Sequence, residues 1–223
     1  MKQDSNLAKA YLEAYEKACL ALLACDSEMV CQNTKAVFEA DKSTYVIRYF
    51  NQEYRIKCTD GYFVFDQEPS ELSITEQVLV LHYLINAKPR PMTGRTISFL
   101  EVPKGGSIYH ATFKKRAVDP LVQTFSGNLG GLINAAEALG GRPETFGDAS
   151  FSVFIFPYVP VTYVLWQGDE EIASSGTILF DASVSDFLPT EDLVLAASYG
   201  TYRLIGEHKK NQTVKSEDKM IFQ

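Results

Sequence analysis

Three apolar segments in the last third of the chain constrain its fold most. Residues 151–156 and 161–166 are apolar runs of strand length, and prolines at positions 157 and 160 interrupt the chain between them. A third run, residues 177–180, follows a polar stretch. Short apolar runs rich in β-branched and aromatic residues are typical of buried strands. We therefore expect a sheet whose central strands come from this part of the chain.

The remaining segments predict helices together with a second set of strands. Apolar residues recur at helical spacing in residues 5–24 and 74–87, which predicts a helix in each segment. Ser73 and Glu76 form a capping-box pattern at the start of the second helix. Four strand-like segments lie between them and predict an antiparallel meander covered on one face: 35–40, 44–50, 53–57 and 62–65. Further helices are expected at 107–115, from Asp119-Pro120, at 128–139 and after Thr190.

Together these elements predict an α+β protein with a mixed or antiparallel sheet packed against several helices. We expect one domain over residues 1–208, because no linker-like segment interrupts the pattern. The polar residues 209–223 predict a disordered tail.

The formal charge of -7 argues against nucleic acid or an anionic membrane as a partner, since both favour a basic surface. No apolar run approaches the roughly 18 to 20 residues that cross a bilayer. The first residues do not read as a secretory signal, so the expected compartment is the cytoplasm.

The four cysteines do not predict a metal site. Cys19, Cys25 and Cys31 are spaced evenly, and Cys58 lies far from them in the sequence. No pair has the Cys-x-x-Cys spacing of zinc and iron–sulfur sites. The simplest interpretation of Cys19 is a small residue on the apolar face of the first helix. The sequence assigns no cofactor.

Positive charge is concentrated in one segment. Residues 88–116 contain seven Lys and Arg residues and one acid, Glu101, a net charge of +6. One interpretation is a solvated surface; the other is a site for an anionic small molecule or an acidic protein partner. For the second interpretation the candidate binding residues are basic and aromatic side chains: Arg95, Lys104, His110, Arg116, Tyr109 and Trp166.

Carboxylates suggest an alternative function. Asp169 lies in the polar stretch after Trp166, and Asp181 follows the apolar run 177–180. Two carboxylates in different environments could serve as acid and base in a small hydrolase. The competing interpretation is structural, with Asp169 in a turn and Asp181 as a helix cap.

Two glycine-rich segments are candidates for phosphate binding, the first for a simple anion and the second for a nucleotide. Pro103-Lys104-Gly105-Gly106 precedes a predicted helix, and residues 127–131 precede another. Free backbone N–H groups at such a position can bind phosphate. Neither segment has the P-loop or dinucleotide spacing, so a turn is the simpler interpretation.

Two longer blocks resemble a known family. The first is residues 84–99, LINAKPRPMTGRTISF, and the second runs from Val159-Pro160 through Trp166-Gln167-Gly168-Asp169-Glu170-Glu171 to Leu188-Pro189. Both resemble the DUF3786 family of prokaryotes, found mainly in anaerobes. The resemblance implies an accessory role in anaerobic metabolism, with an anionic cofactor or a corrinoid or iron–sulfur protein as partner. It supplies no catalytic residues.

Overall fold

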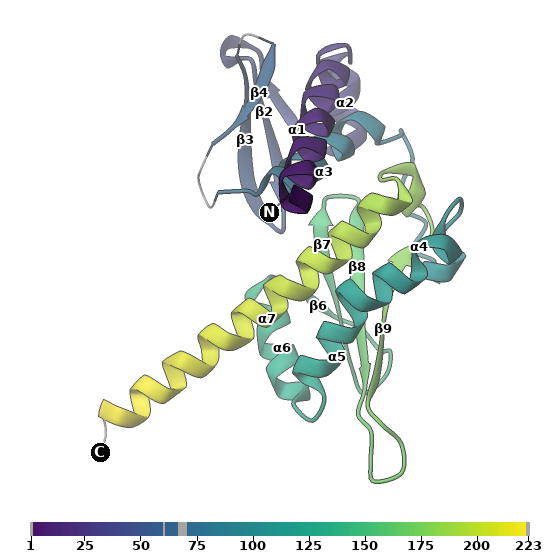
Figure 1. Ribbon diagram of the computed structural model, residues 1–223, viewed down its shortest axis with the longest axis vertical. Coiled ribbons are helices and arrows are strands. Elements are labelled where there is room, and N and C mark those ends of the chain that lie inside the picture. Colours follow the sequence, from purple (N-terminus) through teal and green to yellow (C-terminus); the bar gives the residue numbers. More distant parts are fainter. Residues whose placement is uncertain (1, 60, 67–70, 222–223) are drawn as a thin grey trace. The chain divides into compact units, whose positions relative to one another are not determined.

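The computed structural model describes residues 2–59, 61–66 and 71–221 (Figure 1). The chain forms two compact units, although its sequence shows no linker between them. Unit 1 contains Met1–Met92, Phe156–Tyr158 and Ser183–Pro189. Unit 2 contains Thr93–Ile155, Val159–Ala182 and Thr190–Gln223. The chain therefore passes between the units several times, and we describe each unit separately.

Unit 1 contains the predicted meander. Its antiparallel strands lie in sequence order: β1 (Val37–Glu39), β2 (Thr44–Tyr49), β3 (Gln52–Thr59) and β4 (Tyr62–Phe65). Tyr45 and Ile47 alternate with more exposed residues, so one face of the sheet is apolar and buried. The opposite face carries ion pairs such as Arg55–Glu39 at 2.8 Å. The prediction of a sheet covered on one side is confirmed.

Helices cover the apolar face of this sheet. They are α1 (Lys2–Leu23), α2 (Ser27–Thr34) and α3 (Ile74–Asn86). The capping box of Ser73 and Glu76 is present, and the middle of α3 is buried as its apolar sequence predicts. On α3, Tyr83 stacks on Phe156 with ring centroids 4.2 Å apart. The short helix α2, capped by Asp26, was not predicted.

Unit 2 contains a five-stranded antiparallel sheet in the order β5-β9-β8-β7-β6. Its strands are β5 (Thr96–Ser98), β6 (Arg142–Pro143), β7 (Ala149–Phe156), β8 (Val159–Trp166) and β9 (Ser175–Asp181). The three apolar segments predicted as central strands are the three middle strands, and β7 and β8 are almost wholly buried. This arrangement confirms the α+β class, with two antiparallel sheets instead of one.

Helices pack against this second sheet (Figure 1). They are α4 (Gly106–Phe113), α5 (Asp119–Phe125), α6 (Leu129–Ala138) and α7 (Thr190–Ile221). The Tyr163 hydroxyl of β8 donates to the Ala197 carbonyl of α7 at 3.1 Å, which ties the long helix to the sheet. Helix α7 extends to Ile221, so the predicted disordered tail 209–223 is helical over most of its length.

A π-helical turn, η3 (Lys114–Val118), joins α4 directly to α5. Asp119 was expected to cap a new helix, but its backbone is helical and its N–H donates to the Lys114 carbonyl. Pro120 has no N–H with which to continue the α-helical ladder. In the same turn the Ala117 carbonyl accepts from the Thr201 hydroxyl of α7 at 3.0 Å. Such π turns are frequent at functional sites.

Candidate partner-binding surface

The start of α4 is fixed by close backbone packing. A Cβ added at Gly106 would lie 2.3 Å from the Phe99 carbonyl oxygen, a distance that real side chains do not allow. Gly105 has φ +151° and lies against Thr190, whose hydroxyl donates to the Pro103 carbonyl at 3.3 Å. Both glycines therefore have a packing role, which favours the turn interpretation of this loop over the anion-binding one.

One face of α4 packs into unit 2. Phe113 stacks on Phe99 with ring centroids 4.0 Å apart, and both rings lie near Phe180 of β9. The Tyr109 hydroxyl donates to a Glu191 carboxylate oxygen of α7, and this bond raises the pKa of Tyr109. Tyr109, which the sequence suggested as a ligand contact, thus attaches α4 to α7.

The opposite face of α4 is exposed and partly apolar. Ile108 is 79% exposed, and Leu100, in the turn that packs beside the start of α4, is 56% exposed. Lys104 lies in the loop just before α4, with φ +61°, and Lys115 and Arg116 lie in η3 just after it; all three residues are exposed. We call Leu100, Lys104, Ile108, Lys115 and Arg116 the α4 surface.

The cations of the α4 surface have no acidic partner among residues 2–59, 61–66 and 71–221. Within the described part of the chain, Lys104, Lys115 and Arg116 form no ion pair, and neither does Arg95. Lys88 and Arg90, at the start of the basic segment, lie in unit 1 and pair with Asp186 at 2.9 and 3.7 Å. Ion pairs within the protein therefore neutralise only part of the +6 charge of residues 88–116.

Nearby acids are already engaged. Glu101 accepts from the backbone N–H and hydroxyl of Ser98, both at 2.8 Å. These bonds, with a smaller contribution from Arg95, lower the pKa of Glu101. Asp119 pairs with Lys114. Glu101 therefore keeps its negative charge without an ion pair to the α4 surface, whereas the charge of Asp119 is offset by Lys114.

Trp166 lies away from the basic residues. It pairs with Ser175 at one end of β9, whereas Thr96 of β5 pairs with Asp181 at the other end. Six residues of antiparallel strand span about 20 Å. Trp166 is 42% exposed at its end of the sheet, and it does not join Arg95 in one site. His110 is half-buried on α4.

The two candidate catalytic acids lie at opposite ends of the same strand. Asp181 ends β9, and Asp169 lies in the loop before β9 begins. Their backbones are therefore separated by about 20 Å or more, whereas paired catalytic carboxyl groups of glycosidases lie roughly 5 to 9.5 Å apart. The structure does not bring these two residues together.

Each of these acids has a structural role in its surroundings. Asp181 is 8% exposed and accepts from the Thr93 N–H, the Thr93 hydroxyl and the Gly94 N–H at 2.7 to 3.0 Å. It anchors the loop before β5 and does not cap a helix. Asp169 accepts from the N–H groups of Ile172 and Glu171, which lower its pKa.

The acidic loop is shaped by Gly168 as well as by Asp169. A Cβ at Gly168 would lie 2.1 Å from the Ile172 carbonyl oxygen, so the loop folds back against its own glycine. The motif Trp-Gln-Gly-Asp-Glu-Glu thus encodes a tight turn.

The thiols do not form a metal centre. Cys19 is buried, and the other three cysteines are free and partly exposed. Over residues 2–59, 61–66 and 71–221, no group of three His, Cys, Asp or Glu side chains is placed to hold a metal ion. Among the helices that the structure describes, none has the length and apolarity to span a membrane.

Comparison with known families agrees with the two motif blocks. A family model described as "Domain of unknown function (DUF3786)" matches residues 26–203. The chain belongs to the DUF3786 family. The matched region includes the α4 surface, the acidic loop and most of both sheets. Searches of curated proteins and of solved structures found no match.

Sequence reasoning missed three of the five residues of the α4 surface. It selected Lys104 and Arg116 for their charge, and passed over Leu100, Ile108 and Lys115. No sequence pattern singles out Leu100, Ile108 or Lys115, because the packing of Phe113 on Phe99 decides which face of α4 points outward.

Proposed function

We propose that this protein is an accessory protein that binds an acidic protein partner through the α4 surface. The observation that carries the proposal is the combination of exposed Ile108 with cations that have no acid of their own. Exposed apolar area ringed by polar residues is typical of protein–protein contact sites. Unpaired cations favour a partner of opposite charge and would speed its association.

The acidic character of the remaining protein supports this choice of partner. The chain carries a net charge of -7, so an acidic partner would be repelled by most of its surface and attracted at the α4 surface. Electrostatic attraction confined to one patch fixes the orientation of a complex. Ile108 and Leu100 would supply apolar contact at the centre of that patch.

The nature of the partner is a narrower proposal. Resemblance to the DUF3786 family suggested a cofactor-bearing protein, of corrinoid or iron–sulfur type, in anaerobic metabolism. Binding of an anionic cofactor by the protein itself is the competing form of this proposal. The hydrolase alternative with Asp169 and Asp181 receives no support from their placement.

Site-specific photo-crosslinking tests the proposal. A photoreactive amino acid replaces Ile108 in the full chain, which is expressed in its source cell, irradiated and analysed by mass spectrometry. We expect a covalent adduct with one protein, joined at an acidic region of that protein. A matched control carries the same amino acid at Tyr202, which is 56% exposed on α7 and outside the α4 surface. It should give no such adduct.

Charge reversal completes the experiment. Lys115→Glu and Arg116→Glu should abolish the adduct, and lysine at the crosslinked acids of the partner should restore it. An adduct with a second copy of this chain would overturn the proposal. So would a partner adduct that survives both reversals, or the absence of any adduct at position 108.

A further inference from the structure

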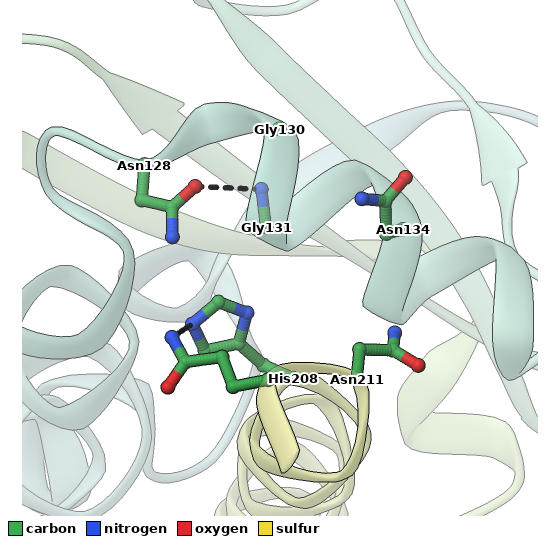
Figure 2. A pocket seen from close by; sticks show the side chains of 7 residues that line it. Asn128, Gly130, Gly131, Asn134, His208 and Asn211 are labelled. Carbon is green, nitrogen blue, oxygen red and sulfur yellow. Dashed lines mark hydrogen bonds between the residues drawn. The ribbon is translucent and has the colours of Figure 1, made fainter. Parts of the chain in front are cut away.

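A second site lies in unit 2, away from the α4 surface. A cavity of about 260 Å³ opens between α6 and the C-terminal half of α7 (Figure 2). Among the described residues it is lined by Asn128, Gly130, Gly131, Asn134, His208, Asn211 and Gln212, none of which is Lys, Arg, Asp or Glu, and apolar atoms make up more of the lining than polar atoms do. The volume is room for roughly eight or nine waters at about 30 Å³ each, or for a small polar ligand.

The Asn128 side chain presents a donor to this cavity. Its Oδ1 accepts from the Gly131 N–H at 2.9 Å and caps α6 (Figure 2). Because the cap occupies the oxygen, the amide nitrogen is the group left for the cavity. The first N–H groups of a helix have no intrahelical acceptor. At Gly130, which also lines the cavity, the N–H has no acceptor among the described residues.

His208 supplies a second side-chain donor from α7. It is 8% exposed and packs edge-on against Phe125, with centroids 5.2 Å apart. Its Nε2 lies 2.7 Å from the Gln212 amide nitrogen. An amide nitrogen can only donate, so Nε2 accepts and the ring proton lies on Nδ1. Nδ1 has no partner among the described residues and faces α6, 2.8 Å from where a Gly131 Cβ would be.

The donors therefore converge from two helices. Asn134 and Asn211 add carboxamides that form no side-chain hydrogen bond with any described residue. The amino terminus of α6 contributes the positive end of a helix dipole. No carboxylate lines the cavity, so nothing there repels negative charge. A ligand that satisfies these groups must offer acceptor oxygens and carry little bulk.

We infer that this cavity is a binding site for a small oxyanion, a carboxylate or phosphate group. The site binds through hydrogen bonds and the helix dipole, without a fixed cation. Its glycines serve the site in different ways. Gly131 admits the His208 ring, which a Cβ would strike at 2.6 Å, and Gly130 leaves the cavity open because a Cβ there meets nothing within 4 Å.

Nuclear magnetic resonance of the full chain tests this inference. Sodium phosphate and sodium acetate are titrated separately at constant ionic strength, with chloride as the balancing ion, while the Gly130 and Gly131 amide shifts are followed. We expect saturable shifts with at least one of the two anions. The anion that binds more tightly distinguishes a phosphate site from a carboxylate site. No saturable shift with either anion would overturn the inference.

Two variants with matched controls localise the binding. Asn128→Asp keeps an N-cap residue but replaces the donor with a negative charge, and should weaken binding at least about tenfold. Gln167→Glu adds the same charge outside the cavity and should bind as the wild type does. Gly130→Leu fills the cavity and should abolish binding, whereas Gly206→Leu, another open helical position, should not. Unchanged affinity in both cavity variants would overturn the inference.

Discussion

Replacement of Asp181 by asparagine distinguishes a structural carboxylate from a catalytic one. The carboxylate is 8% exposed and accepts three hydrogen bonds from Thr93 and Gly94. Asparagine keeps one acceptor oxygen and places an amide N–H₂ where another backbone donor points. Hydrogen bonds to charged groups contribute about 1.5 to 3 kcal/mol each, and a buried donor left unpaired costs about 1 to 3 kcal/mol. We expect Asp181→Asn to lower the free energy of unfolding by about 2 to 4 kcal/mol.

Urea unfolding followed by tryptophan fluorescence measures this effect. Trp166 is the only tryptophan and lies in unit 2, the same unit as Asp181. With a slope of about 2 kcal/mol per molar urea, the midpoint should fall by about 1 to 2 M. Asp169→Asn is the control, since asparagine also forms the turn bonds that Asp169 makes, and it should move the midpoint less than Asp181→Asn does. Equal midpoints for Asp181→Asn and the wild type would refute this reasoning.

Three further predictions concern local features of unit 2. Thr201→Val removes the buried hydroxyl bonded to the π-helix and should destabilise the protein by about 1 to 3 kcal/mol in the same urea assay. Gly106→Ala should destabilise it by about 1 to 3 kcal/mol through the clash with the Phe99 carbonyl, whereas Gly206→Ala, which meets nothing, should stabilise it by up to about 1 kcal/mol. The pKa of Asp169 is lowered in the folded state, so the ionised carboxylate stabilises the fold above the ordinary Asp pKa. This stabilisation is lost as pH falls through the lowered pKa. A titration of the Asp169 carboxyl carbon by nuclear magnetic resonance should show a midpoint below the ordinary Asp value.

The sequence predicted local structure well where the signal was local. Apolar runs identified β7, β8 and β9, and the pair Ser73 and Glu76 identified the start of α3. Burial of both faces of β7 followed from its largely apolar sequence, which only Ser150 and Ser152 interrupt. These features depend on residues a few positions apart.

Features that depend on distant contacts were not predicted. Residues 156–158 and 183–189 belong to unit 1 although their neighbours belong to unit 2, and no linker composition marks those crossings. The π turn is hydrogen-bonded at Ala117 by Thr201, 84 residues later in the sequence. Asp119-Pro120 was predicted to start a helix, and α5 does begin at Asp119, but the preceding residues are already helical, so Asp119 does not cap a free helix end.

The candidate site shows the same limit. Charge selected Arg95, Lys104 and Arg116, whereas aromatic character suggested Tyr109 and Trp166, which serve packing or lie at the far end of the sheet. Whether a cation has an acid nearby depends on the fold, as the pairing of Lys88 with Asp186 shows. For the same reason the sequence did not reveal that His208 and Asn128 lie at one cavity.

The most direct test of the proposed function is the salt dependence of partner binding. The partner identified by crosslinking through position 108 is purified, and its dissociation constant is measured by calorimetry from low to high sodium chloride, for the wild type and for Lys115→Glu/Arg116→Glu. The proposed function predicts affinity that weakens steeply with salt in the wild type, and binding at least about tenfold weaker in the double variant. Affinity that is independent of salt and equal in the two proteins would contradict it.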